Sequence, residues 1–216
     1  MIDTEPALAA GLAALRGRDP LIDDLVRNGA EPPLRKREGG FPGLVSIVVA
    51  QQVSTASAAA ILRRLEEAVP GLSATSMAAT EDAVLLGAGL SRPKLRTLRA
   101  AGAAVLAGDL PLDRLGTEEP SRARALLTSV IGIGPWTADI YLLFCVGHPD
   151  IFPSGDLALR EAARSALRLA ERPDARGLGA IAERWSPWRG IAALVLWTHY
   201  RNLKGRRGDV PTAARS

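Results

Sequence analysis

The sequence predicts an all-α protein. Alanine, leucine and arginine recur at helical spacing, whereas alternating runs of β-branched and aromatic residues are nearly absent. Glycine and proline punctuate the chain between the helical stretches. With 216 residues, of which 47% are hydrophobic, the chain can form one large domain or two small lobes around a sizeable core.

The expected helices share an apolar face that repeats with helical period, and their ends are placed to within about two to four residues. They cover residues 5–16, 20–28, 42–52, 54–69, 81–87, 92–107, 119–130, 135–146, 156–170, 174–185 and 187–203. Loops are expected at residues 32–38, 70–71 and 148–149, where proline, glycine or charged residues gather. Residues 205–216 are expected to form a frayed tail.

The formal net charge of +4 suits a polyanionic partner but is equally compatible with ordinary solubility. Arginine supplies nearly all of the positive charge, since lysine occurs only at Lys36, Lys94 and Lys204. Two basic stretches, 92–99 and 201–207, are compatible with phosphate contacts and with solvated helix faces. Charge by itself therefore does not decide the partner.

Cys145 is the only cysteine in the sequence, so an internal disulfide, a four-cysteine zinc site and an iron–sulfur cluster are excluded. This predicts a reducing compartment. The N-terminus has Asp3 and Glu5 in place of a positive region, so no secretory signal is expected. The apolar stretches 140–146 and 191–197 are too short to span a bilayer. We therefore expect a cytoplasmic protein without a membrane partner.

The most informative stretch is 126–139, which has Gly132-Ile133-Gly134-Pro135 near its centre. One helix is expected to end just before the glycines, which turn the chain where side chains would clash. Pro135 suits the first position of a second helix, because its φ is fixed and it lacks an N–H. Bare N–H groups at that helix start would bind a phosphate backbone without reading sequence. A plain turn between two helices is the alternative interpretation.

A second motif lies downstream, in the segment 151–160. Phe152-Pro153 and Gly155 indicate a tight loop, and Asp156 opens an amphipathic helix. Aspartate is a preferred N-cap residue and would stabilise the helix by about 1 kcal/mol without any chemistry. Taken alone, Asp156 is therefore compatible with a purely structural role.

The hairpin, the Gly/Pro-rich loop and the aspartate, in this order, resemble the helix-hairpin-helix–Gly/Pro–Asp superfamily of DNA glycosylases. The resemblance reaches from about Pro42 to Trp197 and implies a two-lobed helical bundle with an active-site cleft between the lobes. It also implies that a flipped-out nucleotide is presented to Asp156. Breaking an N-glycosidic bond builds positive charge on the deoxyribose, which a nearby carboxylate stabilises. The same group can orient or deprotonate the attacking water.

The resemblance also assigns the contacts to DNA, which fall on Gly132, Gly134, Thr137, Gln52 and Ser54. The segment 44–59 resembles the Gln-Gln-x-Ser segment of the family, in which a side chain plugs the gap left by the flipped base. Gln52 is the candidate plug, which would offset the few kcal/mol that flipping costs. Alternatively, Gln51 and Gln52 only solvate a helix end. Ser54 is expected to cap the next helix.

Some superfamily members carry a lysine on the second hairpin helix that attacks the sugar and then cleaves the strand. Trp136 stands at the matching position, and no lysine lies between Lys94 and Lys204, so base removal without lyase activity is expected. Trp136 resembles the pocket tryptophan of the alkyladenine branch, whose substrates are methylated purines. Cationic purines are attracted to an indole face by about 0.5–2 kcal/mol. The resemblance therefore implies a monofunctional DNA-3-methyladenine glycosylase for 3-methyladenine and 7-methylguanine in base excision repair.

The base pocket is expected to include Trp136, Trp188 and Ile140. Trp188 lies in a segment that resembles the C-terminal helix of the same branch, and it would face the pocket from the opposite side. Ile140 is a departure, because branch members often have a tyrosine there, and it leaves the substrate range open. Trp185 and Trp197 are expected to pack in the core.

Family members often hold a sodium or potassium ion at the hairpin, which the resemblance places at the backbone carbonyls of Thr128, Val130 and Ile133. No organic cofactor and no iron–sulfur cluster are expected. His148 and His199 have no partners at metal-ligand spacing. The implied partner is double-stranded DNA with alkylated bases, bound by a monomer that associates with the nucleoid.

The expected organisation is one glycosylase unit over 1–216, in the compact form that lacks the N-terminal mixed β lobe of larger bacterial alkyladenine enzymes. One lobe covers about 35–145, and residues 1–34 pack with 146–204 in the other. Three alternatives stay open: a non-catalytic helix-hairpin-helix DNA-binding module, a glycosylase for oxidised or deaminated bases, and a helical interaction scaffold that does not bind DNA.

Overall fold

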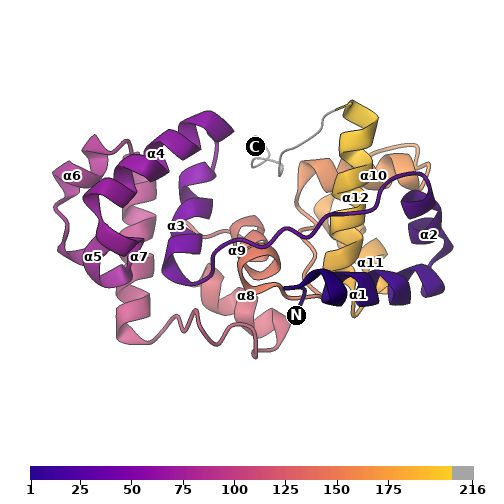
Figure 1. Ribbon diagram of the computed structural model, residues 1–216, viewed down its shortest axis with the longest axis horizontal. Helices are drawn as coiled ribbons and strands as arrows, with labels where there is room; N and C mark the ends of the chain where they lie inside the picture. Colours follow the sequence, from indigo (N-terminus) through magenta and orange to yellow (C-terminus); the bar gives the residue numbers. More distant parts are fainter. Residues whose placement is uncertain (206–216) are drawn as a thin grey trace. The chain divides into compact units, whose positions relative to one another are not determined.

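The computed structural model describes residues 1–205, and its regular elements there are all helical (Figure 1). The lack of strands among these residues confirms the all-α class that the sequence predicts. The chain forms two compact units. The first joins Met1–Lys36 to the described residues from Gly147 onward, and the second is Arg37–Val146.

The first unit is built around α12 (Arg189–Lys204), on which every residue from Gly190 to Thr198 is buried. A helix that is apolar on all sides is stable only when other elements surround it. In this unit α1, α2 and α10 pack against α12. The remaining elements of the unit are α1 (Glu5–Arg18), α2 (Pro20–Arg27), α10 (Leu157–Ala166), α11 (Ala175–Ala182) and the 3₁₀ turn η3 (Glu183–Trp185).

The second unit is built around α3 (Gly40–Ala50), of whose eleven residues seven are buried. It packs against α4, α7 and α9. The other elements of this unit are α4 (Thr55–Ala68), the 3₁₀ turn η1 (Pro70–Leu72), α5 (Ala74–Ala79), α6 (Asp82–Gly87), α7 (Arg92–Ala107), α8 (Pro120–Thr128), α9 (Pro135–Tyr141) and the π-helical turn η2 (Leu142–Val146).

The helix α5 is absent from the sequence-based prediction. Its serine-rich start is typical of a loop, but Ser73 and Ser76 form a capping box in which each hydroxyl accepts from the other residue's backbone N–H. The helix also packs against α7, whose Arg99 donates to the carbonyl oxygens of Met77 and Thr80. Arg99 is therefore only partly exposed and is bonded to α5. Tertiary contacts thus stabilise a helix too short to be predicted.

Two predicted helices differ from the structure towards their C-terminal ends, one by four residues, which is within the stated margin, and the other in its geometry up to its predicted end at Val146. The helix expected over 156–170 ends at Ala166, and Arg168 has a left-handed φ of 51° that cannot continue a helix. The helix expected over 135–146 leaves α-helical geometry after Tyr141 and continues as η2. The tail expected over 205–216 lies outside the described residues, apart from Gly205.

Asp19 joins the N-terminal helices of the first unit to its C-terminal part. Its Oδ1 caps α2 by accepting from the N–H groups of Leu21 and Ile22, at 2.9 and 3.4 Å. Its Oδ2 accepts from Arg184 Nε at 2.7 Å and Trp185 Nε1 at 2.8 Å. Burial by itself raises the pKa of Asp19, but these hydrogen bonds outweigh it and hold the pKa below the ordinary 3.8. The side chain is therefore a charged, fully bonded link within the core.

We expect Asp19→Ala to lower the free energy of unfolding by about 2–4 kcal/mol, because it removes a helix cap and leaves the buried Trp185 N–H without an acceptor. Asp174→Ala is the matched control, since Asp174 caps α11 through Gly177 N–H at 2.7 Å and is exposed. It should cost only about 1 kcal/mol. Urea unfolding followed by circular dichroism measures both, and equal losses would contradict the role of Asp19.

Candidate active site

Asp156 lies at the end of the Gly/Pro-rich loop and is the N-cap of α10. Its Oδ1 accepts from Leu159 N–H at 3.0 Å, and its own N–H donates to Pro153 carbonyl oxygen at 2.9 Å, which closes the turn. The residue is only 1% exposed. The capping interpretation of Asp156 is therefore confirmed, and the depth of burial goes beyond what a surface cap needs.

Trp197 of α12 is the partner that the sequence analysis missed. Its Nε1–H donates to Asp156 Oδ1 at 3.0 Å, and the residue is 5% exposed. The burial of Trp197 supports the predicted core position, but its indole nitrogen bonds the candidate catalytic carboxylate. A buried tryptophan usually needs an acceptor for its N–H, and this is the one signal in the sequence that could have prompted the pairing.

The predicted hairpin lies between α8 and α9, and Ile133 N–H donates to the carbonyl oxygen of Val130 at 3.0 Å within its turn. Gly132 has φ of 85°, and a Cβ at this position would lie 1.9 Å from Thr97 Oγ1, so only glycine fits. The same expectation is wrong for Gly134, which has φ of −84° and where a Cβ would meet no heavy atom within 4 Å. Gly134 is instead the N-cap residue of α9 and, because it has no side chain, it cannot form a side-chain cap. The start of α9 therefore receives no hydrogen bond from an N-cap side chain.

An ion pair joins the two helices of the hairpin. Arg124 Nε of α8 lies 2.6 Å from Asp139 Oδ1 of α9, and Asp139 is 4% exposed. Burial raises the pKa of Asp139 to about 6, and Arg124 opposes the shift only in part. The pair therefore holds the hairpin helices together at the cost of a strongly desolvated carboxylate.

Hydrogen bonds fix the residues that directly precede Gln52, the candidate plug. Gln51 is the C-cap of α3, and its Nε2 donates to Thr137 Oγ1 of α9 at 2.8 Å. Lys94 Nζ donates to the carbonyl oxygen of Val49 at 2.8 Å. Gln52 follows with φ of 55° and an exposed side chain, a strained conformation that persists only when the surrounding structure imposes it.

The other predicted residues of this segment and of the base pocket lie as follows. Ser54 caps α4 by accepting from Ser57 N–H at 3.1 Å, as predicted. Trp136 is the second residue of α9 and is partly exposed, whereas Ile140 on the same helix is 1% exposed. Trp188 is partly exposed in the first unit, where its ring lies beside α1. The roles of Trp136, Trp188 and Ile140 in a base pocket stay predictions.

The described residues contain no group of three or more histidine, cysteine, aspartate or glutamate side chains that could hold a metal ion. Cys145 is buried, which raises the pKa of its thiol to about 12.

In the part of the chain that the structure describes, no helix combines the length and the apolar character needed to cross a membrane. The predicted core position of Trp185 is confirmed, since this residue is fully buried.

The all-α fold, the glycine hairpin and the buried aspartate after a Gly/Pro-rich loop are together typical of one class of helix-hairpin-helix proteins. The chain belongs to the HhH-GPD superfamily of base excision DNA repair proteins, whose family model matches residues 45–187. This range includes the hairpin and the loop with Asp156, but it ends before Trp188 and Trp197.

Three known proteins illustrate the similarity. The chain is 35% identical over 192 residues to a Mycobacterium tuberculosis protein named probable bifunctional transcriptional activator/DNA repair enzyme AlkA, and the match covers 79% of this chain but 38% of that protein. DNA-3-methyladenine glycosylase 1 of Schizosaccharomyces pombe is 28% identical over 164 residues, which cover 73% of this chain and 71% of the relative. The crystal structure of DNA-3-methyladenine glycosidase from Bacillus halodurans matches with a TM-score of 0.82 and 27% identity, over 94% of this chain and 92% of that chain.

The raised pKa of Asp139 predicts a specific pH dependence. In the unfolded chain this carboxyl has a pKa near 3.8 and in the folded chain about 6, so the folded protein binds the extra proton between these values. Its stabilising contribution is complete below the lower pKa and is lost as the pH rises through 6. We expect the free energy of unfolding of the wild type, relative to Asp139→Asn, to fall across this interval and then level off. Urea titrations between about pH 4 and 8 test this, and a pH-independent difference would contradict it.

Proposed function

We propose that this chain is a monofunctional DNA glycosylase that flips alkylated purines out of duplex DNA and hydrolyses their N-glycosidic bonds in base excision repair. One observation carries the proposal: the aspartate of the superfamily motif, Asp156, is buried and receives the indole N–H of Trp197. The names of the yeast relative and the Bacillus halodurans protein support 3-methyladenine as substrate. The chain spans only 38% of the mycobacterial relative's length. The activity and the substrates of this chain are therefore part of the proposal.

In the proposed reaction the bond between the sugar C1′ and the purine nitrogen breaks, and its electron pair leaves with the base. The positive charge that develops on the sugar is stabilised by the Asp156 carboxylate, which the protein has already oriented. A water oxygen then bonds to C1′, and Asp156 accepts the proton that the water loses. Trp197 and the Leu159 N–H keep the carboxylate in place, so that little reorganisation is needed during the reaction.

Trp136 occupies the position at which strand-cleaving members of the superfamily carry a lysine, so no Schiff base forms and the product is an abasic site. Charged purines would stack on its partly exposed indole. Trp188 and Ile140 are proposed as further pocket residues, and the absence of a tyrosine at Ile140 leaves room for purines of different shape. The proposed substrates are alkylated purines of the 3-methyladenine and 7-methylguanine type.

The hairpin and the plug segment supply the proposed DNA contacts. Gly132, Gly134 and Thr137 bind the phosphate backbone at the start of α9, where the N-cap residue is a glycine. Gln52, exposed on its strained turn, fills the gap left by the flipped base, and Ser54 fixes the start of the helix behind it. The partner is thus double-stranded DNA, bound by a monomer associated with the nucleoid.

A sodium or potassium ion at the carbonyls of Thr128, Val130 and Ile133 is part of the proposal. The helix α8 ends at Thr128, where carbonyl groups lack intrahelical partners and the helix dipole favours a cation. Carbonyl oxygens are suitable ligands for such an ion, which would add positive charge next to a DNA phosphate. No organic cofactor takes part in the proposed reaction.

A non-catalytic DNA-binding module is the second candidate, and one observation favours it: Asp156 does cap α10. A cap alone needs an acceptor and no negative charge, whereas stabilisation of a sugar cation needs the charge. The two candidates therefore differ in what an isosteric neutral residue at this position should do.

Asp156→Asn keeps an oxygen for Leu159 N–H and Trp197 Nε1 but removes the negative charge. We expect release of methylated bases from alkylated duplex DNA to fall by about 100-fold or more, with affinity for abasic duplex DNA changed little. Asp174→Asn, at the exposed cap of α11, is the control and should leave release unchanged. Binding without base release by the wild type, even with excess enzyme, would favour the DNA-binding module.

Trp197→Phe removes the N–H that orients Asp156 while retaining an aromatic ring. Because a hydrogen bond to a charged group contributes about 1.5–3 kcal/mol, we expect base release to slow by about 10- to 100-fold. Trp185→Phe is the matched control, because Trp185 also donates its indole N–H to a buried aspartate in the same unit, Asp19. Both variants should lose stability, but only Trp197→Phe should slow release well below the unfolding temperature. Equal rates for the two variants would exclude the orienting role.

A further inference from the structure

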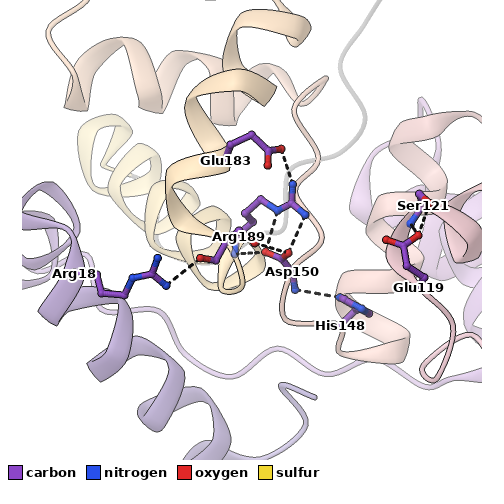
Figure 2. A network of polar contacts seen from close by, with 8 residues as sticks. Arg18, Glu119, Ser121, His148, Asp150, Glu183 and Arg189 are labelled. Carbon is purple, nitrogen blue, oxygen red and sulfur yellow. Dashed lines mark hydrogen bonds and ion pairs between the residues drawn. The ribbon is translucent and has the colours of Figure 1, made fainter.

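Asp150 lies in the same loop as Asp156. It ties this loop to Arg189 at the start of α12 (Figure 2). Its Oδ1 accepts from Arg189 Nε at 2.9 Å and its Oδ2 from Arg189 Nη2 at 2.8 Å, so the guanidinium is bound at two points. Ser186 Oγ also donates to Oδ2 at 2.9 Å. Arg189 Nη1 in turn bonds Glu183 at 2.6 Å. One carboxylate thus holds both the turn before α12 and its first residue.

The same loop caps α12 from outside that helix. Trp188, the N-cap residue of α12, provides no side-chain cap. Asp150 Oδ1 accepts from Arg189 N–H at 3.2 Å, and the carbonyl oxygen of Pro149 accepts from Gly190 N–H at 2.7 Å. A negative charge is favourable at this end because the helix dipole is positive there. The loop is therefore bonded both to the side chain of Arg189 and to the backbone of α12.

The burial of this pair distinguishes it from the exposed ion pairs of the protein. The Asp150 and Arg189 side chains are 13% and 22% exposed, whereas those of Arg63 and Glu67, an exposed pair on α4, are 66% and 63% exposed. Exposed pairs contribute little to stability, but a two-point arginine–carboxylate contact shielded from water is ordered and directional. The hydrogen bond from Arg189 to Asp150 is also the main cause that raises the pKa of Arg189.

The loop and α12 are thus joined at two places along a rigid helix, at Asp150–Arg189 and again at Asp156–Trp197. At about 1.5 Å per residue, the two contacts on α12 are roughly 12 Å apart. We propose that Asp150 is a positioning residue that fixes the register of the loop against α12 and so sets where the Asp156 carboxylate lies. The inference rests on the proposed function for its catalytic consequence, but its structural part can be measured separately.

The first measurement is single-turnover base release from alkylated duplex DNA, together with the Kd for abasic duplex DNA. Asp150→Ala should slow release by about 10- to 100-fold, because a small misplacement of a catalytic group costs this much, while the Kd changes little. Asp23→Ala is the matched control, since Asp23 in the same unit also bonds arginine through both of its carboxylate oxygens, to Arg16 and to Arg27, and has 22% of its side chain exposed. It should leave the release rate unchanged.

Asp150→Asn loses the charge and keeps one acceptor oxygen, which can serve either the Arg189 N–H and Nε or Ser186 Oγ but not both, so it should recover only part of the rate. This variant also carries the test if Asp150→Ala does not fold.

The second measurement is hydrogen exchange of the Leu159 N–H, which bonds Asp156 Oδ1 and needs no activity to be read. Faster exchange in the Asp150 variants, but not in Asp23→Ala, supports the positioning role. If the wild type releases no base and this selective change is still seen, the proposed function fails while the positioning of Asp156 by Asp150 stands. Exchange that is the same in the Asp150 and Asp23 variants overturns the inference, whatever the release rates are.

Discussion

A carboxylate that is taken out of water must receive hydrogen bonds, and this constraint determines how the helices pack inside each unit. The buried aspartates of the described residues each accept from a side chain on another element, in the pairs Asp19 with Trp185, Asp139 with Arg124, and Asp156 with Trp197. Within residues 1–205 no buried side-chain nitrogen or oxygen lacks a partner. A helix that docked in another register would leave a buried charge unpaired, at a cost of several kcal/mol. The polar pairs therefore act as register marks for apolar helices that could otherwise pack in several ways.

The structural and chemical interpretations of Asp156 are compatible with each other. A helix start is a favourable place for a negative charge, so capping α10 helps to keep a carboxylate in a buried position. The same oxygen accepts the N–H of Trp197, which ties the cap to α12. A carboxylate held in this way is already oriented before substrate arrives, as electrostatic catalysis requires. The protein thus uses one side chain to end a loop, start a helix and present a charge.

Sequence reasoning worked where the signal is local. Gly132 permits a turn that side chains cannot make, as its φ of 85° and the clash that a Cβ would make with Thr97 show. Ser54 and Asp156 were expected as caps because their side chains bond backbone groups only three residues away. The reasoning went wrong at Gly134, which has ordinary backbone geometry, because the same residue type serves as a turn and as an uncapped helix start. It missed α5 because packing against α7 makes a six-residue helix stable.

The helical class, the hairpin, the order of the motif and the position of the aspartate can be read from the sequence, since periodicity, glycine geometry and capping act over a few residues. Which buried groups meet depends on how the helices pack. Trp197 and Asp156 lie 41 positions apart, and Arg189 and Asp150 lie 39 apart, so no local pattern relates them. Their pairing follows from the way α12 is enclosed by its neighbours and from the need of each buried charge for a donor.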